Sequence, residues 1–189
     1  MSDLRVVVVV STDMSDIYFA NYLMAHLNVV AVVVESQRAV PEGARWVKAL
    51  KMISQPAKLF SRLGDFFMAK YRRRFAPYNQ DGNRADFGDW GRDLFLCEGC
   101  EVLYTKGLNA INQPEYVDWV KACQPDVIAV CGASIFKDAL IRLPSKGVLN
   151  LHGGLSQRYR GLFTTDWAVH NEEPEYVGGT VHYVAPGID

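Results

Sequence analysis

Long apolar runs are missing from this chain. The longest one near the start, Val6 to Val10, is far shorter than the roughly 20 residues that a helix needs to cross a bilayer. The N-terminus also lacks the pattern of a secretory signal peptide. We therefore expect no membrane span and a cytoplasmic location.

Cysteine is scarce, with four residues in 189. Cys97 and Cys100 have the spacing of a zinc or redox motif, but Cys123 and Cys131 lie eight positions apart. Cys131 also falls in an expected buried strand. We therefore expect no bound metal, and reduced, mostly structural thiols in a reducing compartment.

The overall composition is that of one globular domain. Hydrophobic residues make up 49% of the chain, charged residues 22%, and the formal net charge is -1. A chain of this length and composition can bury one sizeable core, so we expect a single domain over residues 1–189.

Short β-branched runs alternate with helical patterns along the chain. Strands are expected at residues 5–10, 29–34, 102–105, 127–130, 148–152 and 180–184, and helices at 15–25 and 114–122. The first run is almost continuously apolar, as in a central strand that is covered on both faces. This order predicts an α/β, Rossmann-like open sheet, mostly parallel, with helices on both faces.

Polar side chains come together where the last two apolar runs stop. Asn150 and His152 are two apart on the run that begins at Val148, so on a strand they face the same side. Asp189 follows the run from Thr180 to Val184. If both runs are neighbouring parallel strands, their carboxyl ends lie side by side, where open α/β sheets bind ligands. We therefore expect these three side chains to share one site.

This part of the chain resembles the catalytic domain of the folate-dependent formyltransferases. That family includes methionyl-tRNA, glycinamide ribonucleotide and nucleotide-sugar N-formyltransferases. The resemblance rests on Val148-Leu-Asn-Leu-His152, Leu155-Ser-Gln-Arg-Tyr-Arg-Gly161, Trp167-Ala168, Gly179-Thr-Val-His-Tyr183 and Gly187-Ile-Asp189. It implies catalytic roles for Asn150, His152 and Asp189, with 10-formyltetrahydrofolate as co-substrate and an amine as acceptor.

The chemistry of formyl transfer suits these three side chains. The Asn150 amide can donate to the oxyanion that develops when an amine attacks the formyl carbon. The His152 imidazole can exchange protons near neutral pH, and the Asp189 carboxylate can orient it and relay protons. Without the surrounding motif, an Asn and a His at a strand end are more often turn or cap residues.

Two other histidines are expected to be structural. His182 alternates with apolar neighbours on a strand, and His170 sits near a helix end. We assign neither a catalytic role.

The resemblance suggests further binding residues. The folate site would be lined by Gly132, Ile135 and Phe136, which lie in the turn after the fourth strand, and by Val184. Simple core packing explains the apolar residues of this set equally well. Two residues on the loop that ends at Gly161 would contact the acceptor or the folate. Tyr159 would do so by stacking, and Arg160 by a bidentate hydrogen bond to an anionic group. An exposed loop with no such task is the alternative.

The first βα turn, residues 11–16, contains two acids and no glycine. Such a turn is poorly suited to bind a phosphate, although it precedes the N-terminus of a helix, where anions commonly bind. The family's glycinamide ribonucleotide enzymes carry a glycine-containing phosphate-binding turn here, and its tRNA enzymes a Gly-Thr-Pro turn. We therefore favour a small amine acceptor, such as a nucleotide-linked amino sugar, over tRNA. Asp13 is a candidate contact to the acceptor, while Ser15 and Asp16 are expected to cap the helix.

Residues 43–76 are expected to form a basic helical insertion that is broken near Pro56. Nine basic residues there accompany one acid, Asp65; they are Arg45, Lys48, Lys51, Lys58, Arg62, Lys70, Arg72, Arg73 and Arg74. We favour a solvated basic face. The alternatives are a rim for a phosphorylated acceptor, tRNA included, or a surface for a partner or an anionic membrane.

Asp189 is the last residue, whereas the family continues beyond its catalytic Asp. We therefore expect a chain that is truncated at its C-terminal end. The alternatives to small-amine formylation are methionyl-tRNA formylation, hydrolysis of the formyl-folate with water as acceptor, and an inactive remnant that binds folate or a partner.

Overall fold

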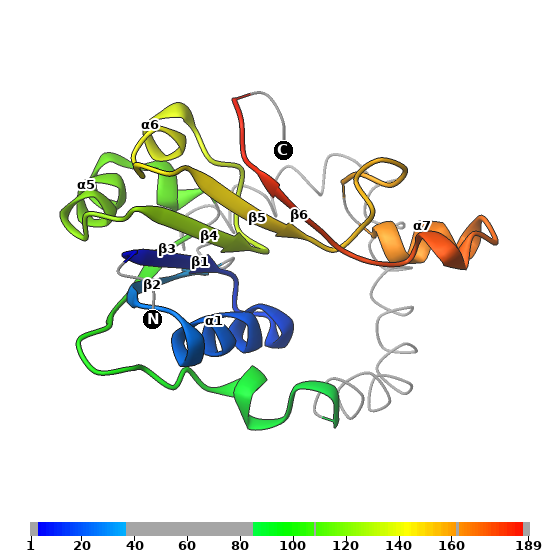
Figure 1. Ribbon diagram of the computed structural model, residues 1–189, viewed down its shortest axis with the longest axis horizontal. Coiled ribbons are helices and arrows are strands. Elements are labelled where there is room, and N and C mark those ends of the chain that lie inside the picture. Colours follow the sequence, from blue (N-terminus) through cyan, green and yellow to red (C-terminus); the bar gives the residue numbers. More distant parts are fainter. Residues whose placement is uncertain (1–3, 37–84, 108, 162, 187–189) are drawn as a thin grey trace, which may run out of the picture.

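One sheet organises the part of the chain that the structure describes, and within that part it has six strands in the order β3-β2-β1-β4-β5-β6 (Figure 1). The structure is a computed structural model and describes residues 4–36, 85–107, 109–161 and 163–186. The strands are β1 (Val6–Val10), β2 (Val29–Ser36), β3 (Glu101–Lys106), β4 (Val127–Cys131), β5 (Val148–His152) and β6 (Thr180–Tyr183). All neighbouring strands are parallel except β5 and β6. The predicted open, mostly parallel sheet is confirmed.

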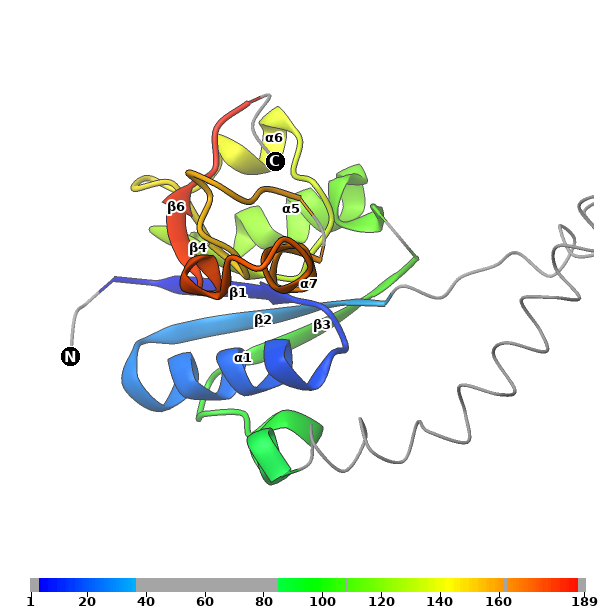
Figure 2. The same ribbon diagram turned by 90° about the vertical axis from the view of Figure 1, so that its right-hand side faces the viewer.

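Helices cover both faces of this sheet, as predicted. They are α1 (Met14–His26), η1 (Ala110–Asn112), α5 (Pro114–Ala122), α6 (Asp138–Ile141), α7 (Thr164–His170) and η2 (Pro174–Tyr176), and residues 85–92 are also helical. Figure 2 shows α1 on one face and α5 with α6 on the other. In the described part of the chain, no helix has the length and apolar character needed to span a membrane.

The valines of β1 explain why this strand is central. Val7 and Val9 belong to the apolar cluster under α5 and α6, whereas Val6, Val8 and Val10 belong to the cluster under α1. Because side chains alternate along a strand, a strand that is covered on both faces must be apolar at every position.

The predicted parallel pairing of the last two strands is wrong. β5 and β6 are antiparallel, with Asn150 opposite His182 and His152 opposite Thr180. A parallel pair needs a crossover that returns the chain to the starting edge of the sheet. Here α7 lies beyond the carboxyl end of β5 instead (Figure 1), so the chain re-enters the sheet at that end and runs back.

Helix α1 begins slightly earlier than predicted. Its N-cap is Asp13, without a side-chain capping hydrogen bond, so the prediction that Ser15 and Asp16 cap the helix is wrong. Both lie in the first turn, where the Ser15 hydroxyl donates to Asp16. The expected insertion at 43–76 lies outside the described residues.

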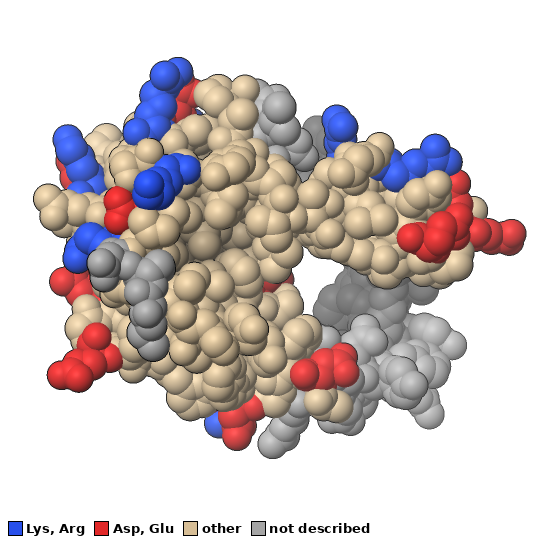
Figure 3. All heavy atoms as spheres, viewed as in Figure 1, with Lys and Arg blue, Asp and Glu red and all other residues tan. Residues whose placement is uncertain are grey.

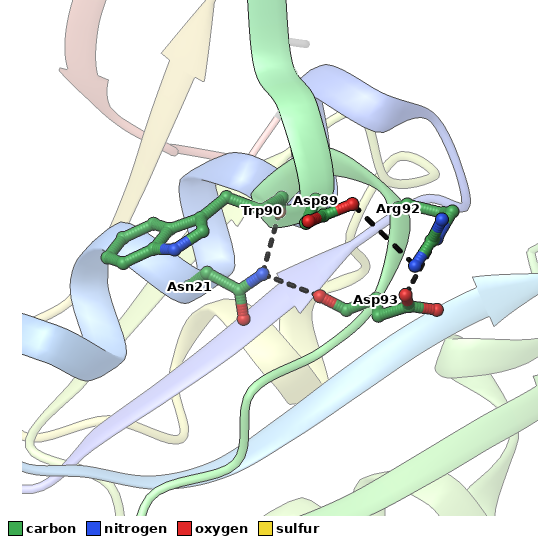
Figure 4. Close-up of polar contacts among 5 residues, drawn as sticks. All are labelled: Asn21, Asp89, Trp90, Arg92 and Asp93. Atoms are coloured by element: carbon green, nitrogen blue, oxygen red, sulfur yellow. Dashed lines mark hydrogen bonds and ion pairs between the residues drawn. The ribbon is translucent and has the colours of Figure 1, made fainter. Parts of the chain in front are cut away.

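A buried amide attaches the helix at residues 85–92 to α1. Asn21, which is 3% exposed, donates from Nδ2 to the Trp90 carbonyl at 2.7 Å and to the Asp93 carbonyl at 2.8 Å (Figure 4). Its Oδ1 accepts from the Phe95 amide at 2.8 Å. A buried amide whose donors and acceptor are used in this way fixes the relative position of the two segments.

The amino ends of three parallel strands are joined by Asp126. Its carboxylate accepts from the Arg5 backbone amide at 2.9 Å and from the Ser145 hydroxyl at 2.8 Å. These two hydrogen bonds hold the pKa of Asp126 below its ordinary value.

We expect Asp126→Asn to remove part of the acid sensitivity of folding. A lowered folded-state pKa stabilises the protein above the unfolded-state pKa, and this contribution is lost as the pH falls from about 4 through the folded-state value. Urea unfolding at several pH values between about 7 and 3 measures the effect. The exposed Asp118→Asn on α5 is the matched control, and equal pH profiles for the two variants would contradict the prediction.

Candidate active site

A cleft of about 850 Å³ opens at the carboxyl ends of β1, β4 and β5. This is the position that an open α/β sheet favours for ligands. The described residues that line it are Ser15, Asp16, Tyr18, Phe19, Tyr22, Phe87, Cys131, Gly132, Ala133, Asn150, Leu151, His152, Gly153, Gly161, Phe163, Thr164 and Gly179.

Asn150 and His152 both line this cleft, on the carboxyl half of β5. Their spacing of two places them on one face of the strand, as the sequence predicts. Asp189, the third predicted member, lies outside the described residues, so the meeting of all three stays a prediction.

The Asn150 amide is oriented by a histidine on the neighbouring strand. Its Nδ2 lies 3.3 Å from His182 Nε2, and His182 Nδ1 lies 3.1 Å from the Tyr183 carbonyl oxygen. A carbonyl only accepts, so Nδ1 carries the proton, and Nε2 of the neutral ring accepts from Asn150. One amide hydrogen of Asn150 is thereby used, which leaves the second for a ligand.

His152 presents an unused ring nitrogen. Nε2 is buried and has no hydrogen-bond partner among the described residues. The ring lies edge-on to that of His182, with 6.5 Å between centroids. A buried polar atom without a partner is costly and is common at sites that bind a ligand.

The β1 side of the cleft contains a buried carboxylate, Asp16. It accepts from Ser11 Oγ at 2.6 Å, from Ser15 Oγ at 3.0 Å and from the Cys131 thiol at 3.5 Å. Burial, together with the nearby Asp16 charge, raises the pKa of Cys131 to about 12, so the thiol stays protonated and can donate.

Aromatic side chains form the adjoining wall. Tyr18 and Tyr22 of α1 and Phe87 of the helix at 85–92 line the cleft, with the Tyr18 and Phe87 ring centroids 5.7 Å apart. The hydrogen bonds of Asn21 hold this second helix in place (Figure 4). The wall can therefore pack against an apolar or planar part of a ligand.

The predicted folate-binding residues separate into different environments. Gly132 lines the cleft, and its φ of 68° is a left-handed conformation that favours glycine. Phe136 is buried in the core cluster that Val184 also contacts, whereas Ile135 is 71% exposed. Core packing accounts for Phe136, and the folate contacts of all four residues stay predictions.

The predicted acceptor-binding residues are not among the described residues that line the cleft. Tyr159 donates its hydroxyl hydrogen to Glu173 and accepts from Asn171 Nδ2 at 2.9 Å. Arg160 donates to the Ser156 carbonyl at 2.6 Å, and Asp13 is exposed. Their contacts with an acceptor stay predictions.

Several lining residues were missed from the sequence. Ser15, Tyr18, Phe19 and Tyr22 recur at spacings of three and four, so they share one face of α1. That helical spacing could have been used to predict that these residues line a common surface. The neighbouring position of Phe87 was not predictable, because it depends on how a distant helix packs against α1.

The cysteines do not form a disulfide: all four are free. Burial raises the pKa of Cys100 to about 12, with a further contribution from Cys97 beside it. Across the described ranges, no group of three or more His, Cys, Asp or Glu side chains could hold a metal ion.

A family model described as "Formyl transferase" matches residues 4–189. The chain belongs to the formyl transferase family. One curated relative is the methionyl-tRNA formyltransferase of Caldanaerobacter subterraneus subsp. tengcongensis, which is 32% identical over 99 residues, or 52% of this chain and 31% of the relative. Another is the bifunctional polymyxin resistance protein ArnA of Wigglesworthia glossinidia brevipalpis, which is 30% identical over 47% of this chain and 13% of the relative.

Solved structures of formyl transferases share the fold. The phosphoribosylglycinamide formyltransferase of Anaplasma phagocytophilum gives a TM-score of 0.56 at 14% identity, over 100% of this chain and 68% of that one. The glycinamide ribonucleotide transformylase 1 of Symbiobacterium toebii gives 0.54 at 15% identity, over 98% and 68%. At these identities the likeness supports the fold alone.

Proposed function

We propose that the protein transfers a formyl group from 10-formyltetrahydrofolate to the amine of a small acceptor such as an amino sugar. The observation that carries this proposal is the pair formed by Asn150 and His152 on the cleft wall. One offers a free amide hydrogen, and the other offers an unpartnered ring nitrogen. The cleft volume of about 850 Å³ is within the usual range for small-molecule sites.

In this proposal each side chain has one task. Asn150 Nδ2, held by His182, donates to the oxygen of the formyl group as negative charge develops on it. His152 accepts a proton from the attacking amine and returns one to the leaving folate nitrogen. Gly132 has no side chain, so a ligand in the cleft can approach the backbone closely at this position.

Asp189 completes the proposed site as the group that orients His152. The end of β6 lies at the opposite end of β5 from His152, because the Val184 amide donates to the Val148 carbonyl at 2.9 Å. The five residues from Val184 to Asp189 can span at most about 17 Å, and the rise from Val148 to His152 is only about 13 Å. Chain length therefore permits Asp189 to reach His152.

A second candidate function, methionyl-tRNA formylation, differs from the first in the acceptor. The curated relatives at 32% and 35% identity are named methionyl-tRNA formyltransferases, and this observation favours tRNA. The cleft favours a small amine instead, since no Lys or Arg is among the described residues that line it. A nucleotide-linked amino sugar would then have to keep its phosphates away from those residues.

The deciding experiment follows the folate product and the acceptor separately. The purified chain is incubated with 10-formyltetrahydrofolate alone, with amino sugars and their nucleotide-linked forms, and with methionyl-tRNA. Formyl-acceptor detected by mass spectrometry identifies the transferase and its substrate. Formate release without an acceptor would identify a hydrolase. No turnover, with binding of a stable folate analogue measured by calorimetry, would identify an inactive folate-binding module.

A further inference from the structure

The Asp16 carboxylate is 6% exposed, yet it belongs to the wall of the cleft. It lies in the first turn of α1, where the helix dipole stabilises negative charge. Three protein donors point at it, from Ser11, Ser15 and Cys131. The cleft wall therefore includes the negative charge of a carboxylate that three protein donors hold in place.

No cation of the described chain balances this charge. None of the ion pairs found among the described residues includes Asp16, and the described lining of the cleft contains no Lys or Arg. The surface over α1 also shows no blue in Figure 3, in keeping with the absence of Lys and Arg from Met14–His26. A buried carboxylate is usually paired, and the described residues supply no counter-ion for this one.

The carboxylate is also fixed in position. A Cβ at Gly132 would collide with Asp16, so the turn after β4 packs its bare backbone directly against this side chain. Ser11, only 1% exposed, donates a hydrogen bond to the carboxylate oxygen Oδ2 that faces Gly132. Asp16 therefore cannot swing away when a ligand enters.

We propose that Asp16 determines acceptor specificity by selecting an ammonium-bearing, unphosphorylated acceptor in this cleft. A helix N-terminus ordinarily attracts an anion, but here the chain supplies that anion itself. A ligand phosphate would meet a like charge at low dielectric, whereas an ammonium group gains a charge-assisted hydrogen bond. An ammonium that serves as the acceptor must release one proton to solvent before its nitrogen can attack, and His152 then accepts the second proton. Only the identification of this ligand as the formyl acceptor rests on the proposed function; the charge selectivity does not.

The test compares three sugars of nearly the same shape by NMR titration without folate. Glucosamine carries an ammonium, glucose is neutral, and glucosamine 6-phosphate adds a phosphate. Wild-type protein is expected to bind glucosamine about tenfold or more tightly than either of the others. Equal affinities, tighter binding of the phosphate, or no binding of glucosamine would each overturn the proposal.

Variants assign the selectivity to one residue. Asp16→Asn keeps the shape of the side chain and is expected to abolish the preference for glucosamine, whereas Asp118→Asn removes an equal charge from the exposed face of α5 and leaves it intact. A preference that survives in folded Asp16→Asn would overturn the proposal. If Asp16→Asn does not fold, the wild-type comparison still decides. Because no folate is present, selectivity without formyl transfer would refute the proposed function alone.

Discussion

Asn150→Ala is expected to lower kcat for formyl transfer by about 10²–10³-fold, the usual cost of removing one oxyanion donor. The Asn150 amide has one hydrogen committed to His182, so its second hydrogen is the one available to the developing oxyanion. Since that interaction strengthens only in the transition state, kcat and kcat/KM should fall together while KM changes little. Steady-state kinetics with the acceptor found in the deciding experiment measures all three.

The control removes an amide elsewhere. Gln113 is exposed at the start of α5 and away from the described cleft, so Gln113→Ala should retain wild-type kinetics. A rise in KM at unchanged kcat for Asn150→Ala would mean that the amide only binds the ground state. Calorimetry with a folate analogue separates this outcome from loss of the folate site.

The fold could be predicted from the sequence because the residue patterns that indicate it are local. The valines of β1 are apolar at every position, which only a doubly covered strand requires. The spacing of Asn150 and His152 likewise fixed their common face before any contact was known. Both inferences depend on the period of a single strand and on nothing farther away.

The direction of β6 and the position of Asp16 in the cleft wall could not be predicted in this way. Strand direction depends on where the connection lies, and α7 lies beyond the end of the sheet. Asp13 and Asp16 have the same chemistry within one turn of the chain, but only Asp16 meets Cys131, which is 115 positions away. Which acid turns inward is decided by that long-range packing, so the sequence analysis assigned the acceptor contact to Asp13 and a capping role to Asp16.

His152→Ala is expected to reduce kcat by about 10²–10⁴-fold, the range for loss of a positioned acid or base. His152 is the one histidine among the described residues that line the cleft, and its Nε2 has no partner there. Without it, the attacking amine and the leaving nitrogen must exchange protons with water. Steady-state kinetics with the acceptor found in the deciding experiment measures the loss of kcat.

His170→Ala is the matched control, since His170 ends α7 and packs edge-on against Trp167 outside the described lining. It should retain the wild-type kcat. If His152→Ala folds and keeps the wild-type kcat, proton transfer does not pass through this imidazole. Solvent or Asp189 would then carry the proton. The unpartnered Nε2 would in that case have only a binding role, because an enzyme that exchanges protons through His152 must lose activity with the ring.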